Sequence, residues 1–193
     1  MTADDGRGGL RPWPETARRS LTRFKIFDVV LAERTSPRTG SSHGFFLIET
    51  WNWVNVVALT TDDELVLVRQ YRHGSAGFTL EIPGGCVEPG ESAADAAVRE
   101  LREETGFATD DAPLHLGTVQ PNPALFTNRC DTYLVTGCRR VGDIQPDPGE
   151  DIEVLTMPLD AVEDLVRQGT IQHALVLNAL YLHRLAARDH RRR

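Results

Sequence analysis

Residues 85–107 read GCVEPGESAADAAVRELREETGF, and this stretch decides the fold and much of the chemistry. We predict a helix from about residue 92 to residue 105, with 3.6 residues per turn. Glu100, Glu103 and Glu104 then occupy positions i, i+3 and i+4 on one face of that helix. Carboxylates so close repel one another unless a cation neutralises them, and oxygen ligands suit a hard divalent ion. The helix therefore predicts a Mg²⁺ or Mn²⁺ site of the kind that handles phosphate groups.

The same stretch resembles the motif of a known family, the Nudix box. That motif reads Gly-x5-Glu-x7-Arg-Glu-U-x-Glu-Glu-x-Gly-U, where U is an aliphatic or bulky apolar residue. Every specified position is filled in this chain, and the resemblance therefore identifies the segment as a Nudix box. The residues that fill the motif are Gly85, Glu91, Arg99, Glu100, Leu101, Glu103, Glu104, Gly106 and Phe107.

A solvated acidic helix with no chemical role is the alternative interpretation of the carboxylates. Against it, Ala94, Val98, Leu101 and Thr105 form an apolar stripe beside them. An amphipathic helix of this kind packs on a hydrophobic core, so we expect the helix to lie against a sheet.

The order of the remaining predicted elements resembles the Nudix fold, an α+β architecture. In that fold a mixed β-sheet lies between helices in an α/β/α sandwich. Two predicted strands, within residues 23–33 and 44–50, precede the usual start of the domain. They resemble the small N-terminal antiparallel sheet of the ADP-ribose pyrophosphatase subgroup, as do VLVRQYR (66–72), LEIPGG (80–85) and Pro123. Because such strands help to build a homodimer in that subgroup, we expect a homodimer here.

The predicted organisation of the chain follows from this order. Two helices, 159–167 and 171–187, close the chain, with Gly169 placed to end the first of them. We expect a partly disordered N-terminus (1–20), N-terminal dimerisation strands (21–50), a Nudix hydrolase domain (51–187) and a basic tail (188–193).

The composition is that of an acidic globular protein. The 193 residues suit one domain with an ample core, and the net charge of −7 argues against general nucleic-acid binding. No apolar run approaches the roughly 20 residues of a membrane span, and the first residues lack the apolar core of a signal peptide. Three cysteines without metal-binding spacing indicate reduced thiols. We therefore expect a cytoplasmic protein with no nucleic-acid or membrane partner.

The resemblance implies a role for each box residue. Glu100 and Glu104 should bind the metal directly, with Glu103 as a further ligand or a partner of the ligands. The backbone carbonyl of Gly84 matches a position that often completes the coordination. Arg99 should hold the loop and helix in register by ion pairing. We group it with Glu103 and the general base among the catalytic residues.

A glutamate on a later loop activates the water in several relatives, since the box seldom supplies the base. The segment DPGEDIE offers Asp147, Glu150, Asp151 and Glu153. We favour Glu150 because it lies where the loop meets the following strand. A solvated acidic turn without a catalytic role is the alternative.

Three residues are candidates for substrate binding. Arg72 could grip phosphate oxygens with its guanidinium group. The region after the box departs from the subgroup's Pro-Gly-x-Ser-x-Glu stretch and reads PNPALFTNR (121–129). Within it Asn128 and Arg129 suit a sugar or phosphate, although a structural loop explains them equally well. This departure puts ADP-ribose itself in doubt but not the chemistry.

The predicted activity is metal-dependent hydrolysis of the pyrophosphate bond in a small-molecule nucleotide diphosphate. The substrate would be ADP-ribose or a related nucleoside diphosphate sugar, and the products a nucleoside monophosphate and a sugar phosphate. Two alternatives stay open. One is a Nudix hydrolase of another diphosphate, such as a nucleotide cofactor, a sugar diphosphate or a prenyl diphosphate. The other is a non-catalytic Nudix domain that senses a nucleotide, against which the intact glutamates argue.

Overall fold

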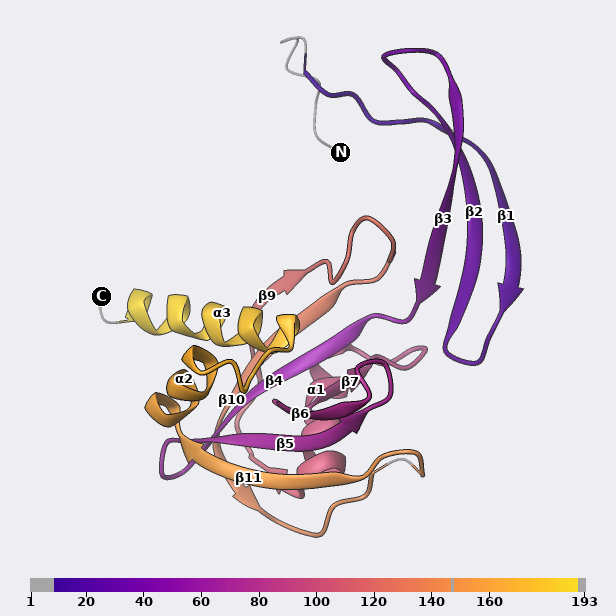
Figure 1. The fold of residues 1–193 in the computed structure, drawn as a ribbon. Helices are drawn as coiled ribbons and strands as arrows, with labels where there is room; N and C mark the ends of the chain where they lie inside the picture. The colour runs from indigo at the N-terminus through magenta and orange to yellow at the C-terminus, as the bar shows by residue number, and fades with distance from the viewer. Residues whose placement is uncertain (1–8, 147, 191–193) are drawn as a thin grey trace. The chain divides into compact units, whose positions relative to one another are not determined.

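The structure is a computed structural model that describes residues 9–146 and 148–190 (Figure 1). These residues form two compact units. The first contains the described residues up to Trp51 together with Asn122–Asn128, and the second contains Asn52–Pro121 and the residues from Arg129 onward. The division falls at residue 51, one residue beyond the predicted end of the N-terminal strands, but the loop 122–128 groups with the first unit.

The first unit is built on an antiparallel sheet, which confirms the small N-terminal sheet expected from the sequence. Its strands are β1 (Glu15–Arg23), β2 (Phe27–Thr35) and β3 (Ser42–Thr50), in the order β1-β2-β3. The sequence predicted β2 and β3 but not β1, whose residues are exposed along its whole length. Because β1 has no buried face, it carries no alternation of apolar and polar residues, and residues 15–20 had been placed in a partly disordered N-terminus.

The second unit contains a mixed sheet. Within the described residues its main path runs β11-β5-β4-β10-β8, while β6 pairs with β5, β7 with β4 and β9 with β10. The β4–β10 pair is parallel and the other pairs are antiparallel. The bounds are β4 (Trp53–Thr60), β5 (Glu64–Arg72), β6 (Gly77–Glu81), β7 (Gly84–Cys86), β8 (Phe107–Ala108), β9 (Leu114–Val119), β10 (Cys130–Arg140) and β11 (Ile152–Pro158).

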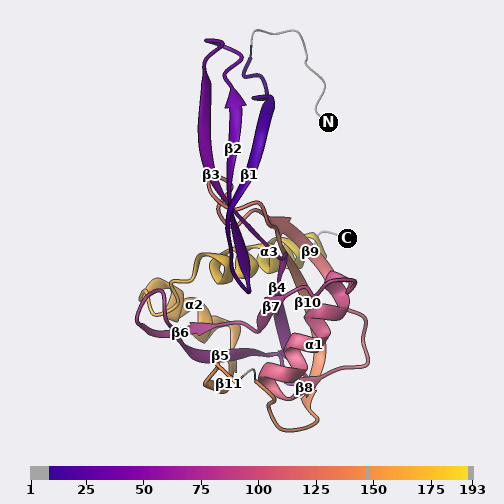
Figure 2. The same cartoon turned by 90° about the vertical axis from the view of Figure 1, so that its right-hand side faces the viewer.

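Helices cover both faces of this sheet, as the predicted α/β/α sandwich requires (Figure 2). The central strands β4 and β5 are nearly continuous apolar runs, which is typical of strands buried on both faces. Alternate residues of β4 face opposite sides. Val56 packs in the core with Ala97 and Leu101 of α1 (Ala93–Thr105), whereas Val57 packs with Val162 of α2 (Leu159–Arg167) and the adjoining α3 (Ala174–His190).

The box helix α1 has capping residues at both ends. The Ser92 hydroxyl accepts a hydrogen bond from the Asp95 N–H at 3.1 Å, which satisfies a backbone donor of the first turn. Gly106 ends the helix in the left-handed region at φ 71° and donates its N–H to Arg102 O. The predicted apolar stripe was partly wrong, because Ala94 and Val98 are only partly buried. The buried face includes Glu104 instead, with Ala96, Ala97, Leu101 and Thr105.

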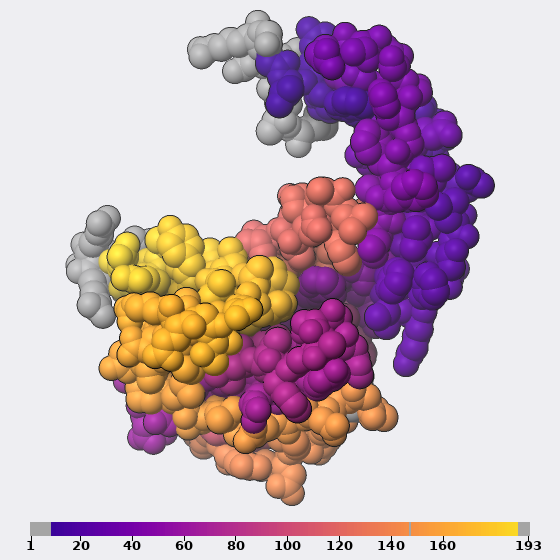
Figure 3. All heavy atoms as spheres, in the orientation of Figure 1, coloured from indigo at the N-terminus to yellow at the C-terminus, as the bar shows by residue number. Residues whose placement is uncertain are grey.

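The closing helices lie side by side on one face of the second unit (Figure 3). Gly169 follows α2 with φ 73°, in agreement with the predicted helix end. The predicted basic tail overlaps the end of α3, which continues to His190, and residues 191–193 lie outside the described residues. None of the described helices combines the length and the apolar character that crossing a membrane requires.

Candidate active site

The box loop and box helix meet at β7. Gly84 and Gly85 pair with Asn55 and Val54 of the central strand β4, which brings the start of the box against the buried sheet. A side chain at Gly85 would overlap the carboxylate of Glu100. The glycine therefore leaves the space in which this carboxylate lies, close to the backbone of β7.

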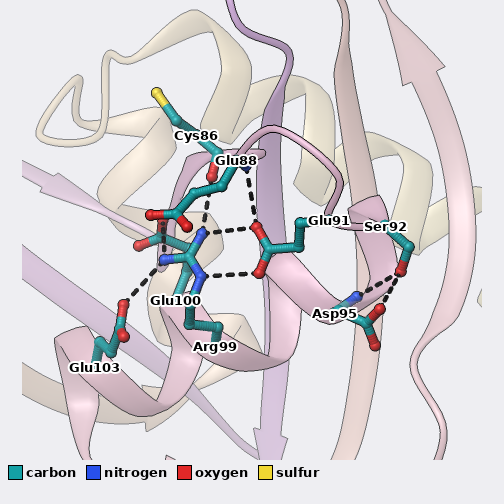
Figure 4. A network of polar contacts seen from close by, with 8 residues as sticks. All are labelled: Cys86, Glu88, Glu91, Ser92, Asp95, Arg99, Glu100 and Glu103. Atoms are coloured by element: carbon teal, nitrogen blue, oxygen red, sulfur yellow. Dashed lines mark hydrogen bonds and ion pairs between the residues drawn. The ribbon is translucent and has the colours of Figure 1, made fainter.

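Arg99 joins the loop to the helix, as the sequence predicted (Figure 4). Its Nε and Nη2 donate to the two oxygens of Glu91 at 2.9 and 3.1 Å, a two-bond geometry that fixes both groups. Its Nη1 donates to Glu100 and Glu103 at 2.9 Å each, and Nη2 also reaches the Cys86 carbonyl at 2.9 Å. Arg99 is thus the cation that balances Glu100 and Glu103 in this structure.

Glu104 lies deeper than the other box carboxylates. Only 3% of its surface is exposed, and its Oε2 accepts a hydrogen bond from the Gly84 N–H at 2.9 Å. Burial raises the pKa of the Glu104 carboxyl to about 8, and the nearby charges of Glu100 and Glu150 act in the same direction. The Gly84 hydrogen bond opposes this effect but does not outweigh it.

Glu100 has the same electrostatic character in a milder form. Burial raises the pKa of its carboxyl, Arg99 lowers it, and the charges of Glu103 and Glu150 raise it again. Neighbouring carboxylates with raised pKa values, one of them buried and the other half-buried, form an environment that a divalent cation would relieve, and hard oxygen donors suit Mg²⁺ or Mn²⁺. The residues therefore fit the predicted ion. Among the described residues, no three acidic, histidine or cysteine side chains are already arranged as a metal cage.

The loop before β11 brings a further carboxylate near this pair. Glu150 contributes to the raised pKa values of Glu100 and Glu104 and interacts with Arg72, which places its charge close to the box residues. Glu153 instead pairs with Arg69 at 3.1 Å on β5. Asp151 is exposed, and Asp147 lies outside the described residues. Of the three candidates for the base that the structure describes, Glu150 is the one whose charge acts on both Glu100 and Glu104.

Arg72, the predicted phosphate-binding residue, ends β5 and faces Glu81. Its Nε and Nη2 donate to the two Glu81 oxygens at 2.9 Å each. The hydrogen bonds that Arg72 donates to Glu81 raise the pKa of Arg72, and the charges of Glu104 and Glu150 add to this effect. Glu81 lies in LEIPGG (80–85) and was not among the predicted site residues. A glutamate between the apolar residues Leu80 and Ile82 was the signal that could have identified it.

The predicted sugar- or phosphate-binding residues differ in their setting. Asn128 belongs to the first unit, where it is 2% exposed and donates from Nδ2 to the Trp51 carbonyl at 3.0 Å. Its environment favours the structural interpretation that the sequence left open. Arg129 belongs to the second unit, where its N–H donates to Asn52 Oδ1 at 2.9 Å and its side chain is exposed. The side chain of Arg129 is therefore accessible to a ligand.

Cys86 lies in the box but has no reactive character. Burial raises the pKa of its thiol, and the neighbouring Glu100 carboxylate acts in the same direction. A thiol that resists ionisation is a poor nucleophile. This supports the interpretation of Cys86 as incidental to the chemistry.

Comparison with known proteins agrees with this geometry. The NUDIX domain model matches residues 51–180. The chain is 35% identical over 130 residues to a Mus musculus ADP-sugar pyrophosphatase, covering 63% of this chain and 58% of that protein. It is 31% identical over 121 residues to the Escherichia coli ADP compounds hydrolase NudE, covering 63% and 64%. The matches thus span about six-tenths of the length of these relatives.

A solved structure shares the fold over nearly the whole chain. The crystal structure of an ADP compounds hydrolase superposes with a TM-score of 0.82 at 24% identity, covering 95% of this chain and 98% of that one. At this level of identity the likeness concerns the fold. Together with the match of the domain model to residues 51–180, it shows that the chain belongs to the NUDIX family.

Proposed function

We propose that the protein is a metal-dependent pyrophosphohydrolase of nucleoside diphosphate sugars, ADP-ribose or a close analogue. The observation that carries this proposal is the placement of the buried Glu104 and the half-buried Glu100 against Gly84 and Gly85 of β7, and the raised pKa values of both carboxyls support a bound cation. The names of the two relatives, both of which refer to ADP compounds or ADP-sugars, support this class of substrate. The products would be a nucleoside monophosphate and a sugar phosphate.

The proposed metal ligands are Glu100, Glu104 and the Gly84 carbonyl, with Glu103 joining them once it leaves Arg99. These residues would hold a divalent ion, which would supply neutralisation of phosphate charge and a lower pKa for the attacking water. Mg²⁺ is the expected ion and Mn²⁺ a substitute for it.

The remaining roles fall to side chains around the carboxylate pair. Glu150 would accept the proton of the attacking water as general base. Arg72 would bind a phosphate of the substrate through its planar guanidinium group. Arg99 would keep Glu100 in position through the bond that it donates to it, and would hold Glu103 until that side chain joins the metal. Arg129 would contact the sugar or the distal phosphate.

A substrate panel tests the proposal. The protein would be assayed with ADP-ribose, ADP-glucose, UDP-glucose, ATP and a prenyl diphosphate, each with Mg²⁺ and with Mn²⁺, and release of the monophosphate would be measured. We expect turnover of at least one nucleoside diphosphate sugar. Glu104→Gln should lower the rate by about 10³-fold or more, since the metal supplies several kcal/mol of charge stabilisation. Asp62→Asn removes an exposed carboxylate from the β4–β5 turn and should leave the rate unchanged.

The panel also separates the alternatives. Turnover of the prenyl diphosphate but of no nucleotide sugar would favour another diphosphate substrate, which the departure at residues 121–129 makes a real competitor. Binding of nucleotides without turnover in either metal would favour a sensor domain.

A further inference from the structure

The phosphate-binding candidate Arg72 is already engaged in this structure. One edge of its guanidinium, formed by Nε and Nη2, donates to Glu81, and only 3% of the surface of Glu81 is exposed. In the β5–β6 ladder Arg72 pairs with Gly77, Gln70 with Thr79 and Val68 with Glu81, so these alternate residues share one face of the hairpin. A phosphate that binds the Nε/Nη2 edge of Arg72 must therefore take it from Glu81.

Glu81 would then lose its main cationic partner while remaining buried. Besides Arg72, it accepts a hydrogen bond from the Thr79 hydroxyl to Oε1 at 2.6 Å, which leaves Oε2 without a bond once Arg72 departs. A buried carboxylate that loses its partner costs several kcal/mol. Burial raises the pKa of Glu81, but the contacts with Arg72, His173 and Thr79 outweigh burial and leave the pKa below its ordinary value.

A second potential donor, His173, lies beside Glu81 Oε2. His173 lies in the segment between α2 and α3, and its Nδ1 is 3.3 Å from Glu81 Oε2. This nitrogen is buried and makes no aligned hydrogen bond while Arg72 occupies the carboxylate. Buried polar atoms in native proteins nearly always have a hydrogen-bond partner. The position of His173 Nδ1, 3.3 Å from a carboxylate oxygen but without an aligned bond to it, therefore needs an explanation.

Resting on the proposed function, we propose that His173 is a positioning residue for phosphate binding, because it replaces Arg72 on Glu81 when the substrate's phosphate takes the arginine. The exchange moves no covalent bond. Arg72 gives up two bonds to Glu81 and gains bonds to phosphate, while His173 Nδ1–H forms the bond to Oε2 that the arginine leaves. The histidine thereby lowers the cost of releasing Arg72 and acts on ligand affinity rather than on the chemical step.

The test measures binding of a simple probe apart from catalysis. Inorganic pyrophosphate with Mg²⁺ would be titrated by calorimetry into the full chain and its variants. We expect His173→Ala to weaken binding about tenfold, the scale of one charge-assisted hydrogen bond, and His173→Asn, which keeps a donor near the Nδ1 position, to restore most of it. His115→Ala removes a histidine from β9, where it pairs with Asp131, and should bind like the wild type.

A double-mutant cycle gives the sharper result. In a Glu81→Gln background no buried charge is left to compensate, so His173→Ala should have no further effect on pyrophosphate affinity. A merely structural role for His173 would reduce affinity equally in both backgrounds, and that outcome overturns the inference. Unchanged affinity in His173→Ala, failure of His173→Asn to restore it, or no pyrophosphate binding by the wild type overturns it as well.

The result of the His173 experiments can be distinguished from the result of the substrate panel that tests the proposed function. If none of the panel substrates is hydrolysed but the cycle behaves as expected, the positioning role stands and the assigned activity fails. If nucleotide sugars are hydrolysed and His173→Ala leaves both pyrophosphate affinity and KM unchanged, the activity stands and the positioning role fails. With an active substrate, His173→Ala should raise KM and leave kcat nearly unchanged.

Discussion

The carboxylate of Glu100 fills the space that a side chain at Gly85 would need, so the first glycine of the box and a proposed metal ligand depend on each other. The preceding glycine is constrained differently. A Cβ at Gly84 would meet the backbone carbonyl of Val54 and the amide of Asn55 on the neighbouring strand. Gly85 therefore leaves space for a side chain of the site, whereas Gly84 allows β7 to pair closely with β4.

We expect Gly85→Ala and Gly84→Ala to separate activity from stability. In Gly85→Ala the flexible end of Glu100 can move aside, so the unfolding free energy should change by less than about 1 kcal/mol, while displacement of the ligand should cost about 10²-fold in rate. In Gly84→Ala the obstacle is backbone, and the loss of stability should be about 1–3 kcal/mol. Urea denaturation and monophosphate release measure the two effects, and equal stability losses in both variants would contradict this division.

The buried Glu104 predicts an unusual dependence of stability on pH. Its pKa is about 8 in the folded protein and returns to its ordinary value of 4.5 on unfolding. Between these values the folded state holds a proton that the unfolded state has lost, so the metal-free protein should become less stable as pH rises through this window. The full effect is on the order of 5 kcal/mol.

Urea denaturation in EDTA at about pH 5 and about pH 8 checks this expectation. Glu104→Gln should remove the loss of stability between the two pH values, whereas the exposed control Asp62→Asn should keep it. Added Mg²⁺ should stabilise the wild type most at the higher pH, because the ion binds the ionised carboxylate of the folded state. An equal loss of stability in Glu104→Gln would assign the pH dependence to other groups.

Local patterns predicted the box helix and the layered fold well. The spacing of the glutamates, the cap residue Ser92 and the terminal Gly106 act within a few turns of chain, and they gave α1 within one residue. The orientation of α1 was predicted less well, since a buried Glu104 contradicts the usual partition of charge to the surface. Its carboxylate is tolerated there because Gly84, twenty residues away, donates to it.

Contacts between distant segments could not be predicted from the sequence. Glu81 and His173 meet only because β6 and the segment before α3 come together in the folded unit. Strand β1 went unpredicted for the opposite reason, because it is exposed on both faces and its sequence ETARRSLTR carries no periodic signal. The assignment of Glu150 also depends on the tertiary arrangement, because four acidic residues in one loop look alike in the sequence.

Arg99 should contribute to the site through the geometry of its guanidinium group as well as through its positive charge. Its fork bonds Glu91 twice and also bonds Glu100 and Glu103, which one ammonium group cannot reproduce. We expect Arg99→Lys to cost about 1–3 kcal/mol of unfolding free energy and to lower the rate as well. Arg102→Lys, an exposed change three residues along the same helix, serves as the control and should be nearly neutral. Equal behaviour of the two variants would argue against the bridging role.

The sheet of the first unit predicts self-association. Large apolar side chains such as Ile26 and Phe46, each 61% exposed, lie on or beside its strands. Apolar surface of this kind marks an interaction site, and a two-fold homodimer is the commonest solution. Light scattering should give twice the mass of one chain, and Phe46→Asp should shift it toward the monomer. Phe78→Asp, at a 66% exposed aromatic residue of β6, should not; a monomeric wild type at micromolar concentration would rule the dimer out.

Glu150 and Arg129 should respond to substitution in different kinetic constants. If Glu150 accepts the proton of the attacking water, Glu150→Gln should lower kcat by about 10²–10⁴-fold while metal affinity changes little, because the box glutamates hold the ion. Asp151→Asn, an exposed neutralisation at the adjacent position, is the matched control and should retain activity. Arg129→Ala should mostly raise KM, by a factor that varies between nucleotide sugars if the guanidinium meets the sugar. Equal losses on every substrate would make Arg129 structural, and full activity of Glu150→Gln would transfer the role of base to Asp147, Asp151 or Glu153, which the same assay can distinguish.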